Sequence, residues 1–124
     1  MCIRWTMERP LNWKNSIVLV PFPFDDLSTT KVRPALCLTE RLGSHDHVVV
    51  AFITSQVLGE LDPTDIVIEP TDEDFAQTGL RVASAIRLHR LMTLSIRIVR
   101  RKLGTLPEAL QQRTQEGLRQ LFDL

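Results

Sequence analysis

The sequence lacks the patterns that mark the commonest metal and cofactor enzymes. Its 124 residues include two cysteines and three dispersed histidines, with no CxxC or HExxH pair. We therefore expect no metal site. A phosphate-binding glycine loop and a GxSxG elbow are also missing, which argues against the usual cofactor-dependent enzymes. The sequence predicts a protein that works without a cofactor.

Long apolar runs are missing as well. None approaches the roughly 20 residues that a membrane-spanning helix needs. The first residues, MCIRWTMERPLNW, have no apolar stretch typical of a signal peptide. We expect a cytoplasmic chain with no membrane partner. The cysteines agree, because Cys2 lies in this arm and Cys37 lies in the apolar run PALCL, where a buried, unreactive thiol is favoured over a disulfide or a nucleophile.

The net charge is zero, but the charges are unevenly distributed. Residues 60–74 contain seven acids and no Lys or Arg, and residues 81–102 contain seven Lys or Arg and no acid. Such runs are commonly two solvated faces. In a neutral protein the basic run is also consistent with a nucleic-acid path. Both interpretations stay open at this point.

Short apolar segments rich in β-branched residues alternate with turn-forming clusters, which favours a mainly β protein folded as a compact barrel or sandwich. The runs IVLV and VVVAFI do not alternate, so we expect both of their faces to be buried. Ile66–Ile68 lies between acids and is expected at a sheet edge. The predicted strands are Ser16–Val20, Pro34–Thr39, His47–Ile53, Asp65–Glu69 and Val82–Leu88, with a further strand within Ile96–Leu103.

The end of the chain has the pattern of an amphipathic helix. The segment from Thr105 to Glu108 fits a capping box, with Pro107 in the first turn. We expect Gly117 to allow close approach of another backbone. After Glu108, apolar and small residues recur near the helical period at Leu110, Thr114, Gly117, Leu118 and Leu121.

Polar side chains stand at the ends of two predicted strands. Arg33 comes directly before Pro34, and a guanidinium at a fixed place suggests an anion, most commonly phosphate. Thr54, Ser55 and Gln56 end the most apolar strand, where they form either a ligand-facing cluster or a polar turn.

A third candidate is the pair Arg87 and His89 in the pattern SAIRLH. Residues two apart on a strand share a face. A cation beside an imidazole is able to bind and protonate an oxyanion.

Four blocks, in order, resemble the MazF/PemK family of toxin endoribonucleases. They are IVLVPFPFDDLSTTKVRPALCL from Ile17, VVVAFITSQ from Val48, GL at Gly79 followed by SAIRLHRLMTL, and RRKLGTL from Arg100. The resemblance extends from about Asn15 to the end. It implies a single toxin domain over 15–124 with residues 1–14 as an N-terminal arm.

The resemblance implies an SH3-like β-barrel of the CcdB/MazF type with a C-terminal α-helix, normally a homodimer. It implies an mRNA interferase, which cleaves single-stranded RNA without metal through attack by the ribose 2′-OH. It also implies a cognate antitoxin with a disordered acidic tail. The implied catalytic residues are Arg33, Thr54 and Arg87, with His89 as a further candidate. The implied RNA-binding residues are Ser55, Gln56, Asp26, Ser28, Lys31 and Ser84.

Two alternatives belong to other classes. A CcdB-like toxin on the same barrel would inhibit a protein target without catalysis. A degenerate toxin would be retained only to bind an antitoxin. The arginine of the RP pair and the Thr-Ser-Gln cluster favour the ribonuclease, because a protein-target inhibitor has no need of polar groups that converge on phosphate.

Overall fold

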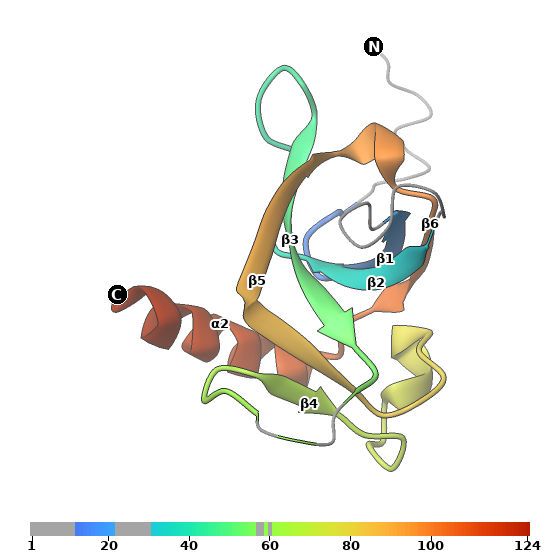
Figure 1. Cartoon of the computed structure of the whole chain (residues 1–124), viewed down its shortest axis with the longest axis vertical. Coiled ribbons are helices and arrows are strands. Elements are labelled where there is room, and N and C mark those ends of the chain that lie inside the picture. The colour runs from blue at the N-terminus through green and yellow to red at the C-terminus, as the bar shows by residue number, and fades with distance from the viewer. Residues whose placement is uncertain (1–11, 22–30, 57–58, 60) are drawn as a thin grey trace.

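The computed structural model describes residues 12–21, 31–56, 59 and 61–124. Across these residues the chain forms six strands, two short 3-10 helices and one α-helix (Figure 1). The strands are β1 (Ser16–Pro21), β2 (Val32–Cys37), β3 (His47–Thr54), β4 (Ile66–Ile68), β5 (Ser84–Ser95) and β6 (Arg101–Thr105); the helices are η1 (Phe75–Thr78), η2 (Ile96–Ile98) and α2 (Glu108–Phe122).

The strands form one antiparallel sheet in the order β4-β5-β3-β2-β1-β6. The sheet curls into a half-barrel, and α2 packs against β4 and β5 at one end of it (Figure 1). This arrangement confirms the expected mainly β fold with a C-terminal helix. It also confirms the placement of Ile66–Ile68, because β4 is an edge strand.

Both faces of the central strands are buried, as the non-alternating runs predicted. One hydrophobic cluster contains Ile17, Ile53 and Leu88 and continues into α2 through Leu110. We call this side of the sheet the helix face. A second cluster, which includes Val20, Val48, Val50 and Leu94, lies on the opposite face. Alternate residues of β1 and β3 therefore enter two different cores.

Strand β5 extends to Ser95, seven residues beyond the predicted end at Leu88. It pairs with β3 along the whole length of that strand, with a bulge between Ala51 and Phe52. The apolar pattern did not predict this extension, because the extension contains exposed polar residues such as Arg90. The further strand predicted within Ile96–Leu103 is β6, which begins at Arg101 and continues to Thr105. Ile96–Ile98, at the start of that range, forms η2, where the Ser95 hydroxyl accepts a hydrogen bond from the Arg97 backbone N–H at 3.2 Å.

The predicted capping box is wrong. Thr105 belongs to β6 and pairs with Ser16, so α2 begins after Pro107, which makes no side-chain capping bond. The predicted buried face of the helix is confirmed, because Leu110, Thr114 and Gly117 are buried. The atom nearest to a Cβ placed on Gly117 would be Leu88 Cδ1 at 2.6 Å. The close approach is therefore mainly to a side chain rather than to a backbone.

Two glycines bring η1 against β6 beside the open end of the sheet. A Cβ on Gly79 would stand 2.1 Å from the Leu103 carbonyl oxygen, and one on Gly104 would stand 2.2 Å from the Gln77 carbonyl oxygen. Gly79 also has a φ of +76°, which favours glycine. Because a side chain would not fit at either position, this contact accounts for the glycine in each of the GL and LG pairs. Among the described helices, none is long and apolar enough to cross a bilayer.

Candidate functional site

Arg33, Thr54 and Arg87 lie on one face of three neighbouring strands. Arg33 pairs with Val20 and Arg87 pairs with Phe52, and both partners pack in the cluster of the opposite face. Thr54 shares the face of Phe52, two residues away on β3. The opposite face therefore presents all three predicted catalytic residues.

The strand register also places these residues close together along the sheet. Ala35 of β2 pairs with Phe52 of β3. If this register continues for two more residues along each antiparallel strand, Arg33 lies across from Thr54. Arg87 is the partner of Phe52 on the other side of β3. Arg87 is thus displaced by two residues along the sheet from the position that Arg33 and Thr54 share.

The Thr54 hydroxyl is oriented by its own turn. Its Oγ1 accepts a hydrogen bond from the backbone N–H of Gln56 at 3.0 Å. With its oxygen accepting, the hydroxyl retains its proton as a donor. The polar turn and the ligand-facing cluster, which the sequence left as alternatives, are compatible: the turn holds the threonine in place at the end of β3.

Arg87 and His89 share a face as predicted, and both reach one carboxylate. Arg87 Nη2 lies 3.2 Å from Asp62 Oδ2, and His89 Nε2 lies 3.4 Å from the same oxygen. A second acid, Asp65, lies 3.3 Å from Arg87 Nε through Oδ1, and its side chain is fully buried. The Arg87 guanidinium therefore sits between two carboxylates.

The two acids of this network were not among the predicted site residues. The sequence predicts only a solvated face for the run of seven acids in residues 60–74. No local pattern distinguishes Asp62 or Asp65 from the other acids of this run. The informative signal is tertiary. Ile66 pairs with Ile86, so Asp65, the residue before β4, comes beside Arg87. A correct β4–β5 register is needed to see this.

Asp62, Asp65 and His89 also place one ligand atom each within 4.8 Å of one another. This spacing is compatible with a metal ion. However, the Arg87 guanidinium already contacts both carboxylates and supplies the positive charge. We interpret the group as an ion-pair network with a bound arginine as its cation.

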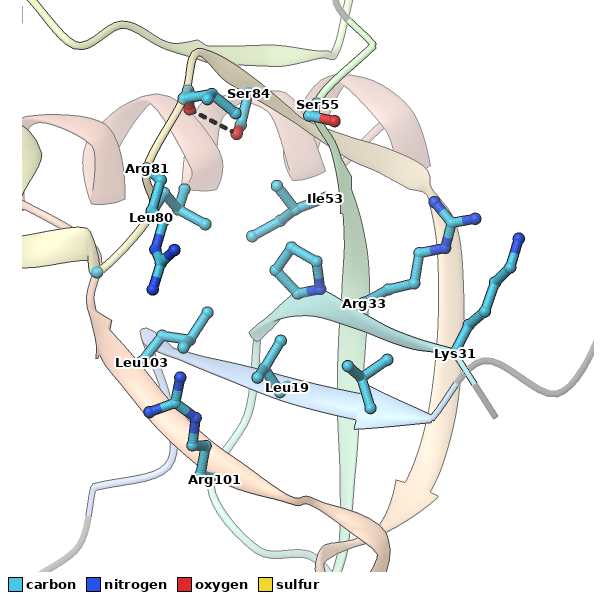
Figure 2. Close-up of a pocket in the computed structure, with 14 residues that line it drawn as sticks. Leu19, Lys31, Arg33, Ile53, Ser55, Leu80, Arg81, Ser84, Arg101 and Leu103 are labelled. Atoms are coloured by element: carbon cyan, nitrogen blue, oxygen red, sulfur yellow. Dashed lines mark hydrogen bonds between the residues drawn. The ribbon is translucent and has the colours of Figure 1, made fainter. Parts of the chain in front are cut away.

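A pocket of about 590 Å³ opens at the end of the sheet where β2 begins and β3 ends. Four predicted site residues line it, and two further cations join them. Figure 2 shows Arg81 and Arg101 pointing toward one another at one side of the pocket, while Arg33 and Lys31 extend away from its centre. The polar and charged lining residues are Lys31, Arg33, Ser55, Ser84, Arg81 and Arg101.

The floor of this pocket is apolar, and it belongs to the helix face. Leu19, Pro34 and Ile53 form part of it. The Ser84 hydroxyl donates a hydrogen bond to the Val82 carbonyl at 2.9 Å (Figure 2). Because the floor of the pocket belongs to the helix face, the lining residues Ser55 and Ser84 lie on the other side of the sheet from Thr54 and Arg87, at the same open end. Arg33 links the two, because it lines the pocket and also lies on the face of the catalytic candidates.

The predicted site residues thus lie in different places. Arg33, Thr54, Arg87 and His89 share one face, and Lys31, Ser55 and Ser84 line the pocket beside it together with Arg33. Gln56 is exposed at the turn after β3. Asp26 and Ser28 lie outside the described residues.

Comparison with known proteins places the chain in a family. The model described as PemK-like, MazF-like toxin of type II toxin-antitoxin system matches residues 14–122. The chain therefore belongs to this family of toxins. Comparison with curated protein sequences found no match.

Several solved structures share the fold. The chain is similar to the Mycobacterium tuberculosis toxin MazF-mt6, at 24% identity and a TM-score of 0.67 over 88% of this chain and 97% of that one. It is similar to a mycobacterial endoribonuclease in complex with its cognate antitoxin, at 16% identity and a TM-score of 0.70 over 92% and 97%. It also resembles MazF from Deinococcus radiodurans, at 19% identity and a TM-score of 0.68 over 92% and 98%.

Proposed function

We propose that this chain is the toxin of a toxin–antitoxin pair and cleaves single-stranded RNA without a metal ion. The observation that carries the proposal is the common face of Arg33 and Thr54, where a guanidinium and an oriented hydroxyl donor stand on adjacent strands. Membership of the MazF-like toxin family supports it. A CcdB-like inhibitor and a degenerate toxin are less favoured, because neither needs such a pair.

The chemistry uses the nucleophile that RNA itself carries. The ribose 2′-oxygen forms a bond to the adjacent phosphorus while the bond from phosphorus to the 5′-oxygen breaks. The 2′-OH proton leaves to a base, and a proton reaches the departing 5′-oxygen. The products are a 2′,3′-cyclic phosphate and a 5′-OH. DNA lacks the 2′-OH and is not cleaved.

Arg33 and Thr54 would stabilise the charge that develops on the phosphorus oxygens. The guanidinium neutralises charge and offers several donors in a plane, and the Thr54 hydroxyl adds one donor from the neighbouring strand. Arginine remains protonated in proteins, so proton transfer falls to another group. His89 lies on the same face, beside Arg87, and is the candidate for it, because the ring nitrogens of an imidazole are able both to accept and to donate a proton.

The pocket at the end of the sheet would hold nucleotides next to the cleaved bond. Lys31, Arg81 and Arg101 surround an apolar floor. Cations in such a groove attract backbone phosphates, and apolar surface accepts an unstacked base. Ser55 and Ser84 offer hydroxyl groups for hydrogen bonds with that base. Arg81 and Arg101, two cations of the basic run in residues 81–102, would in this way contact RNA.

The proposal includes a homodimer and a cognate antitoxin. Val32 and Val82, which line the pocket, are 44% and 54% exposed, and such surface favours a second chain at its edge. One similar structure is an endoribonuclease in complex with its cognate antitoxin. An antitoxin with an acidic tail would complement the cations of the pocket and compete with RNA.

The test is to incubate the purified protein with single-stranded RNA in EDTA and to analyse the ends of the products. We expect fragments with a cyclic phosphate and a 5′-OH. Arg33→Ala should abolish cleavage, while Arg113→Ala, an exposed cation on α2, should leave it unchanged. Intact RNA with the wild-type protein, or full activity of Arg33→Ala, would overturn the assignment.

A further inference from the structure

The pair Arg87 and His89 is already occupied by an anion that belongs to the chain. A single oxygen, Asp62 Oδ2, lies 3.2 Å from Arg87 Nη2 and 3.4 Å from His89 Nε2. An oxygen of a phosphate group bound between these two side chains would take the same place. The carboxylate of Asp62 thus stands where an anionic ligand would bind.

The two acids around Arg87 differ in how firmly they are held. The Asp65 side chain is fully buried, and its Oδ2 accepts a hydrogen bond from the Asp62 backbone N–H at 2.9 Å while Oδ1 faces Arg87 Nε. The Asp62 side chain is 50% exposed. Asp65 therefore fixes the guanidinium and the turn, whereas Asp62 contacts the guanidinium from the solvent side.

This division of roles makes Asp62 replaceable. The half-exposed carboxylate of Asp62 is screened by water and salt, which weakens its ion pair with Arg87. A phosphate carries more charge and more acceptor oxygens than one carboxylate, and it is able to contact both Nη2 and Nε2. Asp62 can move away by rotating its side chain while its backbone remains hydrogen-bonded to Asp65. Arg87 would remain anchored at Nε by the buried acid.

We propose that Arg87 and His89 form a phosphate-binding subsite, which Asp62 fills in the free protein and leaves when the RNA backbone binds. The subsite lies on the face of Arg33 and Thr54, with Arg87 beside the strand that carries Thr54. This inference rests on the proposed function for the source of the phosphate. Asp62 acts as a competitor that lowers the affinity of the resting site.

The first experiment uses inorganic phosphate, so it does not depend on RNA cleavage. Phosphate is titrated into the full chain while NMR follows the Arg87 Nε–H and the His89 ring. Asp62→Asn removes the charge and keeps the shape, so half-saturation should occur at about two- to fivefold lower phosphate, the range expected for loss of one exposed ion pair. Glu73→Gln is the matched control, since Glu73 is an exposed acid of the same run.

Three results of this titration would overturn the proposal. The first is equal half-saturation in wild type and Asp62→Asn. The second is an equal gain in Glu73→Gln, which would mean that net charge alone is responsible. The third is failure of the Arg87 and His89 signals to move with phosphate in any variant.

The second experiment uses a 2′-O-methyl single-stranded RNA, which binds without being cleaved, with affinity measured by fluorescence anisotropy in EDTA. Asp62→Asn should lower Kd by a similar factor. In an Arg87→Lys background, which keeps a charge beside Asp65 but loses the planar fork, the gain should largely disappear. An undiminished gain there would contradict the subsite. If no variant binds RNA but the phosphate result holds, the subsite stands and the proposed function fails.

Discussion

The Nε atom of Arg87 lies 3.3 Å from Oδ1 of Asp65, a carboxylate with no exposed side-chain surface. Neither atom makes a hydrogen bond in the described part of the chain, so the contact is a direct attraction between charges. Arg87 itself is 25% exposed and extends from the buried acid toward solvent. A buried carboxylate beside a strand thus holds the arginine of the predicted site in place.

Asp65→Ala should lower the free energy of unfolding by about 3 kcal/mol, because it leaves a partly buried arginine without its buried partner. Asp62→Ala removes an exposed partner of the same arginine and should cost less than about 1 kcal/mol. Urea unfolding followed by circular dichroism measures both. Equal losses for the two variants would show that burial does not set the strength of this contact.

The second prediction concerns the contact between η1 and β6. Gly104→Ala places a methyl group where the Gln77 carbonyl oxygen would be 2.2 Å away, so the backbone must shift. We expect a loss of about 2 to 3 kcal/mol, typical of overpacking. The control is Gly43→Ala, which has open space but a φ of +71° and should cost about 1 kcal/mol. Thermal or urea unfolding that ranks Gly43→Ala as the more damaging would contradict this steric account.

Much of the fold was predictable because its signals are local. The strand around Ile17 and the strand around Val50 are continuous apolar runs, the pattern consistent with a strand that is buried on both faces. The position of Arg33 also follows from local sequence, since Pro34 and the apolar residues after it define a strand. The blocks that resemble MazF carried the rest of the prediction.

The parts that were missed depend on pairing between distant segments. Thr105 fits a capping box by itself, yet pairing with Ser16 draws it into β6 and moves the start of the helix. The role of Asp65 appears only when β4 is placed on β5. The exposed residues of β5 beyond Leu88 form a strand because β3 offers a paired edge, which no pattern within β5 reveals.

The third prediction concerns the stability at high pH. Burial raises the pKa of the Cys37 thiol from 9.0 to about 12, with a smaller contribution from Glu40. Above pH 9 the unfolded chain releases this proton while the folded chain keeps it. The corresponding stability is therefore present below pH 9 and is lost as the pH rises toward 12.

Urea unfolding of wild type and Cys37→Ala at pH 8 and pH 10 tests this effect. The alanine variant should be less stable at both values, because it leaves a cavity in the core. The difference between the two proteins should nevertheless be smaller at pH 10, since only wild type has this thiol to ionise. A difference that stays constant between the two pH values would rule out the linkage.

The last prediction separates the hydroxyl of Thr54 from its methyl group. Thr54→Val keeps the branched shape that suits β3 but removes the donor, and it also removes the acceptor for the Gln56 N–H. If Thr54 donates to the phosphate in the transition state, kcat for RNA cleavage should fall by about 10²- to 10³-fold. Thr54→Ser keeps the hydroxyl and should retain most of the activity.

Thr54→Val also weakens the turn after β3, so the effect on the turn must be separated from the loss of the hydroxyl donor. Binding of the 2′-O-methyl RNA reports whether the site keeps its shape, and Kd should change much less than kcat. Loss of binding in proportion to kcat would mean that Thr54 only supports the turn. A fully active valine variant would remove the hydroxyl from the mechanism and leave Arg33 as the remaining source of charge stabilisation on that edge of the sheet.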